Sequence, residues 1–262
     1  MLEIARYEAR RRLKGTLYLT VALTLLAGMY IATFPSMADE MDLDQFLDQM
    51  PEVFLELFNI ATMNTIEGFL AAELYSIGWV LLLGLYMAYS AATIIAGDID
   101  RERMDILLSL PVSRARVLGE KFIALLVPIV VVNVVLPVVI YTGTIAIGYP
   151  IDPINLTVVH LLAIPYLLAC GGIGLVLSVL TSRSTIAQRG ALVATFGLFL
   201  FESLTIIADY ERLGAIAPMR YFDATAVLVE GSYDWTGSAV LLGGTVLLVG
   251  TSVLYFRRRD ID

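Results

Sequence analysis

The sequence predicts an all-α, polytopic membrane protein with six transmembrane helices. Of its 262 residues, 58% are hydrophobic and 16% are charged, and the mean hydropathy is +0.81. Soluble domains contain only about 45–50% apolar residues, and a helix needs about 20 apolar residues to cross a bilayer. Six stretches meet that requirement. They cover residues 16–35, 74–96, 122–148, 155–181, 190–209 and 237–256.

The first apolar stretch follows a basic start and ends near a small-residue Ser36-Met37-Ala38 sequence, as a secretion signal does. Its length of about twenty residues exceeds the roughly 7–15 of a cleaved signal. We therefore expect an uncleaved membrane anchor.

The segment from 36 to 73 follows, and every charged residue in it is acidic. Its leucine, phenylalanine and methionine residues recur at helical spacing. This pattern predicts two short amphipathic helices on the outer face of the membrane, with Pro51 in the first turn of the second. A disordered acidic loop is the alternative.

A dense polar segment over residues 97–121 separates the second and third apolar stretches. Residues 98–110 can form one helix, which Pro111 ends because proline lacks an N–H and disfavours helix at the preceding residue. Ser113 is a suitable N-cap for a second helix that continues into the third span.

The basic residues give the expected orientation. If the N-terminus is inside, all of the 17 Lys and Arg except Arg212 and Arg220 fall on the same side. Cytoplasmic loops are enriched in these residues. The sequence therefore predicts both termini and residues 97–121 in the cytoplasm, with residues 36–73 and 210–236 outside.

Two polar residues inside the apolar stretches are candidates for a transport pathway, Asn133 and Glu202. A lone acid within a span is costly unless it is paired, neutral or hydrated. Glu202 is expected either to face the pathway or a second chain, or to lie close enough to the outer interface to be hydrated. For Asn133 a hydrogen bond between helices is the competing interpretation.

Known catalytic patterns are missing from the sequence. One cysteine, Cys170, excludes an internal disulfide, and one histidine, His160, leaves little for hydrolytic or metal chemistry. The chain has no phosphate-binding loop of the G-x-x-x-x-G-K-[ST] type and no H-E-x-x-H or G-x-S-x-G motif. The glycines of Gly171–Leu175 lie inside a span, where we expect close helix packing. We predict no enzyme activity and no cofactor in this chain.

Several motifs nevertheless resemble the permease subunits of exporter-type (type 2) ATP-binding cassette transporters, over essentially the whole chain. The most specific is LLSLPVSRARVLGEK, which is similar to the Leu-Leu-x-x-Pro-[Val/Ile]-[Ser/Thr]-Arg…Lys pattern after the second span of that family. Many members have Gly-Thr where Glu102 and Arg103 stand here. The other matching segments are IARYEARRRLKG, APMRYFDATAVLVEG and YFRRRDI.

The resemblance implies a single permease domain over residues 1–262, with an amphipathic interface helix at 1–15 and an outer hairpin at 210–236. It implies that residues 98–110 are a coupling helix that docks on a separate cytoplasmic ATPase, which would bind ATP and Mg²⁺. A second permease chain, expected to be another copy of this one in a homodimer or else a similar permease in a heterodimer, would complete an export pathway in the cell membrane, in contact with lipid and without nucleic acid. The ATPase-coupling candidates are Asp98, Glu102, Met104, Leu107, Leu108, Pro111, Ser113 and Arg114.

Other functions fit the sequence less well. A secondary transporter needs buried ionisable groups and usually internal repeats, and only Glu202 meets the first need. A membrane anchor or sensor subunit for an ATPase is the stronger alternative. For the polar segment, a simple positive-inside anchor would not need its four acids, Asp98, Asp100, Glu102 and Asp105.

The charge balance also predicts an environment. Net charge is −8, the pI is 4.7, and only two of the basic residues are lysines, Lys14 and Lys121. An acidic, lysine-poor surface suits a halophile, since high salt screens the repulsion between acids. High genomic GC content is another source of the arginine preference.

Overall fold

The computed structural model describes residues 3–40, 64–109, 111–207 and 211–259, and nearly all of them are helical. Among the described residues, six helices are long and apolar enough to cross a membrane, which confirms the predicted fold class. They are α1 (Glu3–Glu40), the continuous run α4–η2–α5 (Ile66–Phe69, Leu70–Leu83, Gly84–Ala91), the pair α8 and α9 (Arg114–Ile123, Leu126–Ala146), α10 (Pro153–Leu180), α11 (Ser184–Ile207) and α13 (Trp235–Arg258).

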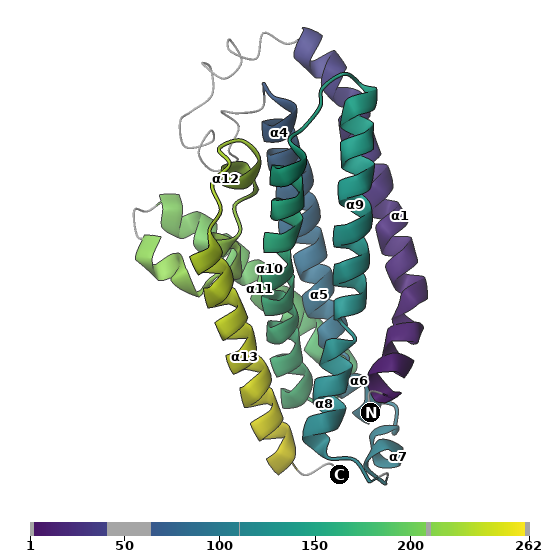
Figure 1. Cartoon of the computed structure of the whole chain (residues 1–262). Helices are drawn as coiled ribbons and strands as arrows, with labels where there is room; N and C mark the ends of the chain where they lie inside the picture. The colour runs from purple at the N-terminus through teal and green to yellow at the C-terminus, as the bar shows by residue number, and fades with distance from the viewer. Residues whose placement is uncertain (1–2, 41–63, 110, 208–210, 260–262) are drawn as a thin grey trace.

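The bundle has two distinct ends (Figure 1). The base, as we call it, holds the start of α1, the end of α13 and two short helices, α6 (Ala96–Ile99) and α7 (Met104–Ser109). The top holds α12 (Ala224–Leu228) and the start of α4, while two 3₁₀ helices, η3 (Glu211–Ile216) and η4 (Pro218–Tyr221), lie beside the upper end of α13. These three short helices lie in the segment over residues 210–236 for which an outer hairpin is predicted, and we keep that name for it.

Helix α1 differs from the expectation of an interface helix over 1–15 followed by a separate span. It is one helix of 38 residues, because Gly15 keeps helical geometry and the first proline inside it is Pro35. At 1.5 Å per residue it is about 57 Å long, well above the roughly 30 Å of a hydrocarbon core. Its first turns therefore project beyond the bilayer. The amphipathic helices expected near Pro51 lie outside the described residues.

Helix α10 is the centre of the bundle. It packs against α5, α9, α11 and α13. Within its most apolar stretch 72% is buried inside the protein, whereas only 17% of the corresponding stretch of α11 is buried. The helix begins at an N-cap, Asp152, whose side chain accepts from the backbone N–H of Ile154 and Asn155. Pro153 occupies the first turn, where its missing N–H costs nothing.

A polar and aromatic group lies inside the core between η2, α9 and α10. Trp79 donates from Nε1 to Oδ1 of Asn133 at 3.0 Å, and Asn133 donates to the carbonyl of Ile129 at 2.8 Å. Asn133 is thus buried and bonded between helices, which agrees with the interhelical interpretation and not with a pathway role. His160, the one histidine of the chain, is only 2% exposed and packs edge-on against Trp79 and Tyr75.

One glycine of the fourth span, Gly174, allows a close contact between two helix backbones. A Cβ added at Gly174 would lie 2.0 Å from the carbonyl oxygen of Ala88 in α5. Because that obstacle is backbone, a side chain at this position cannot be accommodated by a rotamer change. The expected close packing of this glycine is confirmed.

Gly174→Ala is expected to destabilise the bundle by about 1–3 kcal/mol or more, because α5 and α10 must move apart. Gly171→Ala on the same helix is the matched control, since its Cβ would meet only side-chain atoms, those of Leu125 at 3.4 Å and Phe122 at 3.7 Å. Thermal unfolding in detergent measures both. Equal melting temperatures for the two variants would contradict the close α5–α10 contact.

Candidate functional site

The polar segment at the base folds into two short helices and not the single helix expected over residues 98–110, so that prediction was wrong. Helix α6 ends at Ile99, a turn follows over residues 100–103, and α7 starts at Met104. The backbone N–H of Arg103 donates to the carbonyl of Asp98 at 2.8 Å, which closes the turn. Glu102 has a φ of +55°, a conformation that a helix cannot contain. We call residues 96–113 the elbow.

Two serines fix the ends of the elbow. Ser178 of α10 accepts from the backbone N–H groups of Ile95 and Ala96 at 2.9 and 3.1 Å, so the start of α6 is held against the central helix. Ser113 caps α8 by accepting from the N–H of Arg116 at 3.3 Å, as its sequence position predicted. Pro111 lies just beyond α7 and is exposed.

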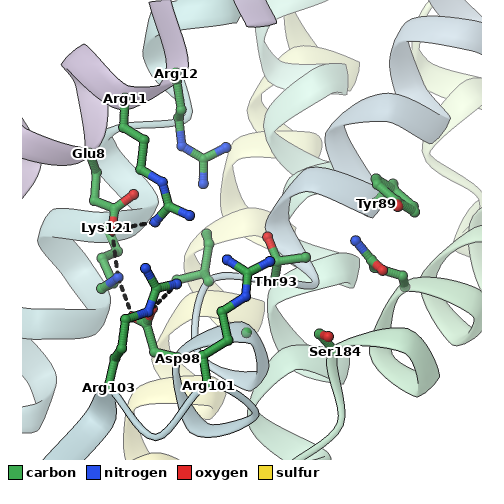
Figure 2. A pocket seen from close by; sticks show the side chains of 13 residues that line it. Glu8, Arg11, Arg12, Tyr89, Thr93, Asp98, Arg101, Arg103, Lys121 and Ser184 are labelled. Atoms are coloured by element: carbon green, nitrogen blue, oxygen red, sulfur yellow. Dashed lines mark hydrogen bonds and ion pairs between the residues drawn. The ribbon is translucent and has the colours of Figure 1, made fainter.

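A lysine ammonium joins the elbow to two long helices (Figure 2). Lys121 of α8 donates from Nζ to Oε1 of Glu8 at 2.7 Å and to Oδ2 of Asp98 at 2.5 Å. Its side chain is 5% exposed, and the carboxylates are 10% and 7% exposed. Arg103 pairs with the other oxygen of Asp98 at 3.2 Å. We call Glu8, Asp98 and Lys121 the lysine clamp, because it connects α1, α6 and α8.

The neighbouring residue strengthens the same connection. Oε2 of Glu120 accepts from the backbone N–H groups of Ile4 and Ala5 at 3.0 and 3.2 Å. These N–H groups belong to the first turn of α1 and have no acceptor within the helix, so a carboxylate there also complements the positive end of the helix dipole. Arg116 holds the other oxygen of Glu120 at 2.7 Å. The start of α1 is therefore bound to α8.

Arginines bring the end of α13 into the same assembly. Arg114 donates to the carbonyls of Phe256 and Arg259, and its guanidinium lies 5.7 Å from the centre of the Phe256 ring. Arg259 in turn donates from Nη1 to the carbonyl of Val179 at 2.5 Å. Arg114, expected as a coupling residue, thus connects α8 to the end of α13, and Arg259 connects that end to α10.

The structure divides the remaining coupling candidates. Asp98 and Met104 are 5% and 1% exposed, so their predicted place on a docking face was wrong: Asp98 turns toward Lys121, and Met104 packs into the core. Glu102 is exposed and Leu107 is half-buried. The side chain of Leu108 lies outside the described part of the chain.

Sequence reasoning missed Lys121, Glu8 and Glu120 as members of this site. One signal was present, since Lys121 is one of only two lysines in a chain that otherwise uses arginine. An ammonium is a compact charge with three donors that fits between two carboxylates, whereas a guanidinium is a larger planar fork. A lysine retained at one position is therefore consistent with two acids sharing it.

Glu202 is paired within its own chain. It is 2% exposed, and its Oε1 accepts from Nη1 of Arg220 in η4 at 3.2 Å. The hydroxyl of Thr205 lies 3.5 Å from its Oε2, and a Cβ at Gly214 would overlap that oxygen at 1.6 Å. The carboxylate is thus enclosed by the outer hairpin, which fits neither the pathway nor the hydrated interpretation.

No group of three or more His, Cys, Asp or Glu residues that could hold a metal ion occurs among the described residues. The site is a set of ion pairs and hydrogen bonds with an exposed polar face, and its chemistry suits binding and force transmission. A family model described as ABC-2 family transporter protein matches residues 2–261. A search of curated proteins returned no match.

Proposed function

The chain belongs to the ABC-2 family of transporter proteins, and we propose that it forms, with a second permease chain, a pathway for ATP-driven export across the cell membrane. A separate ATP-binding cassette ATPase supplies the energy and docks on the elbow. The charge bias supports an orientation with the base of the bundle, and both chain ends, in the cytoplasm.

The lysine clamp is the observation that carries this proposal. A surface that transmits ATPase motion must be exposed on one side and rigidly bound to the spans on the other. The elbow has both properties, since Asp100, Glu102, Asp105 and Ser109 are exposed while Asp98 is fixed to α1 and α8. Movement of the elbow therefore moves both helices.

The proposed second permease chain has a suitable surface. Helices α1 and α11 are largely unburied within the protomer. Only 28% and 17% of their most apolar stretches, respectively, are buried by the rest of the chain. Both lie next to α5, α11 by direct packing and α1 through a hydrogen bond from Arg12 to Ser90. We infer that α1 and α11 contribute to the interface between permeases. Helix α13, which packs on α10, is covered to a similar extent, 22%, so α1 and α11 are distinguished by lying together beside α5.

Charge reversal on the elbow tests the docking. The wild-type chain, tagged and solubilised in mild detergent from its own membranes, is expected to retain an ATPase. Glu102→Arg with Asp105→Arg should lower the retained ATPase about tenfold or more, because like-charge contacts across an interface cost several kcal/mol. Quantitative mass spectrometry of the eluate measures the ratio of the two subunits.

Glu230→Arg is the matched control, because Glu230 is an exposed acid in the outer hairpin. It should leave the ATPase ratio unchanged. Full retention of the ATPase by the elbow double variant would place the docking surface elsewhere. Retention by the wild type without any ATP-dependent transport of cargo would favour an anchor or sensor subunit.

A further inference from the structure

A cavity of about 400 Å³ lies beside the lysine clamp at the base of the bundle. Its walls come from α1, the end of α5, the elbow and the first turns of α11. The cationic side chains that line it are Arg11, Arg12, Arg101, Arg103 and Lys121. We call it the arginine cavity. The binding chemistry is argued from the cavity alone, whereas its place at the cytoplasmic surface rests on the orientation proposed above.

The cavity has an excess of positive charge. Five cations line it, but only two acids do, Glu8 and Asp98. Both acids already bind Lys121, and their contacts to arginine are limited to Arg103 at 3.2 Å and Arg11 at a long 3.9 Å. Three positive charges are left over, although the whole chain has a net charge of −8.

Two of the arginines also have donors without acceptors. The Nε atoms of Arg12 and Arg103 are buried and have no hydrogen-bond partner in the described part of the chain. The acceptor that Arg12 does have is the neutral hydroxyl of Ser90, at 2.5 Å. Buried donors are nearly always paired in folded proteins. The cavity therefore needs a ligand that supplies hydrogen-bond acceptors and negative charge.

The four guanidinium groups point toward one shared space (Figure 2). Arg11 and Arg12 reach it from α1, and Arg101 and Arg103 reach it from the turn of the elbow. Arg101 has an exposed side chain, so it is free to close over a bound group. The opposite wall carries Tyr89 and Thr93, which add neutral polar atoms.

This combination of charge and geometry favours a phosphate group. Arginine forks pair with phosphate and carboxylate oxygens through two parallel hydrogen bonds. A carboxylate supplies one negative charge and two acceptor oxygens, too few for the three excess charges and the unpaired donors of this cavity. A phosphate group supplies more negative charge and more acceptor oxygens. The volume is also within the usual range of small-molecule sites, so a phosphate attached to a larger molecule fits.

We propose that the arginine cavity is a binding site for a phosphate-bearing molecule at the cytoplasmic surface of the membrane. The apolar part of α1 begins immediately above it, since Leu13 and Leu17 are 51% and 62% exposed. The cavity therefore lies at the depth of lipid headgroups, where basic pockets between helices bind anionic lipids. A lipid phosphate and a soluble phosphate compound share the chemistry that the site recognises.

Binding is measured by thermal unfolding of the delipidated full-length chain in neutral detergent at low ionic strength. The probes are phosphatidylglycerol, phosphatidylcholine and glycerol 3-phosphate. Phosphatidylglycerol is expected to raise the melting temperature saturably, and zwitterionic phosphatidylcholine much less. An equal effect of glycerol 3-phosphate identifies a soluble source of the phosphate, whereas an effect of the lipid alone identifies a headgroup.

Arg12→Gln with Arg101→Gln should weaken the apparent affinity by about tenfold or more, because each change removes charge-assisted hydrogen bonds. Arg6→Gln with Arg10→Gln is the matched control, since both residues are exposed on α1 and neither lines the cavity. If the first double variant does not fold, Arg101→Gln alone is tested, because that side chain is exposed and its loss leaves no buried gap.

Three outcomes would overturn the proposal. One is the absence of stabilisation by any phosphate probe. Another is equal weakening in the control double variant, which would mean general attraction to a basic surface. The third is cross-linking of an Arg101→Cys variant to the ATPase in place of phosphate binding, which would make the cavity a receptor for an acidic side chain of the partner.

Discussion

Lys121→Met is expected to lower the free energy of unfolding by about 3–5 kcal/mol, the range for breaking a buried ion pair. The substitution keeps a side chain of similar length but removes the cation between Glu8 and Asp98. In the wild type, Nζ of Lys121 lies 2.7 Å from Oε1 of Glu8 and 2.5 Å from Oδ2 of Asp98. Two buried carboxylates then face each other, with Arg103 as the main compensation. Thermal unfolding in detergent measures the loss.

Lys14→Met is the control, because it removes the other lysine of the chain from an exposed position on α1. A triple variant, Lys121→Met with Glu8→Gln and Asp98→Asn, should recover much of the stability, since it removes the acids together with the cation. In the assembled transporter the single variant should also uncouple ATP hydrolysis from cargo. A melting temperature for Lys121→Met equal to that of Lys14→Met would contradict the clamp.

Much of the architecture was predictable because hydropathy is a local property. Each of the six spans was found from its own run of apolar residues, and all six are present. The second span begins at Ile66 and not near 74, because Thr65 caps the helix and Glu67 and Glu73 are accommodated inside it. The apolar criterion stopped at those acids, although a Thr at the cap position was a visible start signal.

The elbow shows where local reasoning fails. A single helix over residues 98–110 was expected to place Met104 and Leu107 on the coupling surface, but the turn at 100–103 redirects the chain and buries Met104. The turn depends on a positive φ at Glu102, a residue type with no local preference for that conformation. Contacts with Ser178 and Lys121, which are distant in sequence, hold the chain there.

The sequence showed that some charged residues stand in unusual places, but it did not show which residues pair with them. An acid inside an apolar span needs a partner, and this was evident for Glu202 from the sequence. Its partner, Arg220, lies beyond the span in the outer hairpin, so only the fold brings the two together. The same holds for Lys121 and Glu8, which are 113 positions apart.

Arg220→Met is expected to destabilise the protein by about 3 kcal/mol, near the lower end of the range for a broken buried pair. The lower end applies because the Arg220 side chain is 29% exposed, while that of Glu202 is 3% exposed. Without the guanidinium, the Glu202 carboxylate keeps only the nearby hydroxyl of Thr205 among the described residues. Gly214 and the rest of η3 then cover an uncompensated charge, and the outer hairpin should detach from α11 before the bundle unfolds.

The exposed Arg212 provides the control, since Arg212→Met removes an equal charge from the same hairpin without touching Glu202. Combining Arg220→Met with Glu202→Gln closes a double-mutant cycle, and the coupling between the two positions should be about 1–3 kcal/mol. Glu202→Gln alone should cost less than Arg220→Met, because an amide still accepts from Arg220 and leaves no buried carboxylate. If Glu202→Gln instead left stability unchanged but altered cargo-stimulated ATP hydrolysis, Glu202 would be a pathway residue and the pairing with Arg220 only its resting contact.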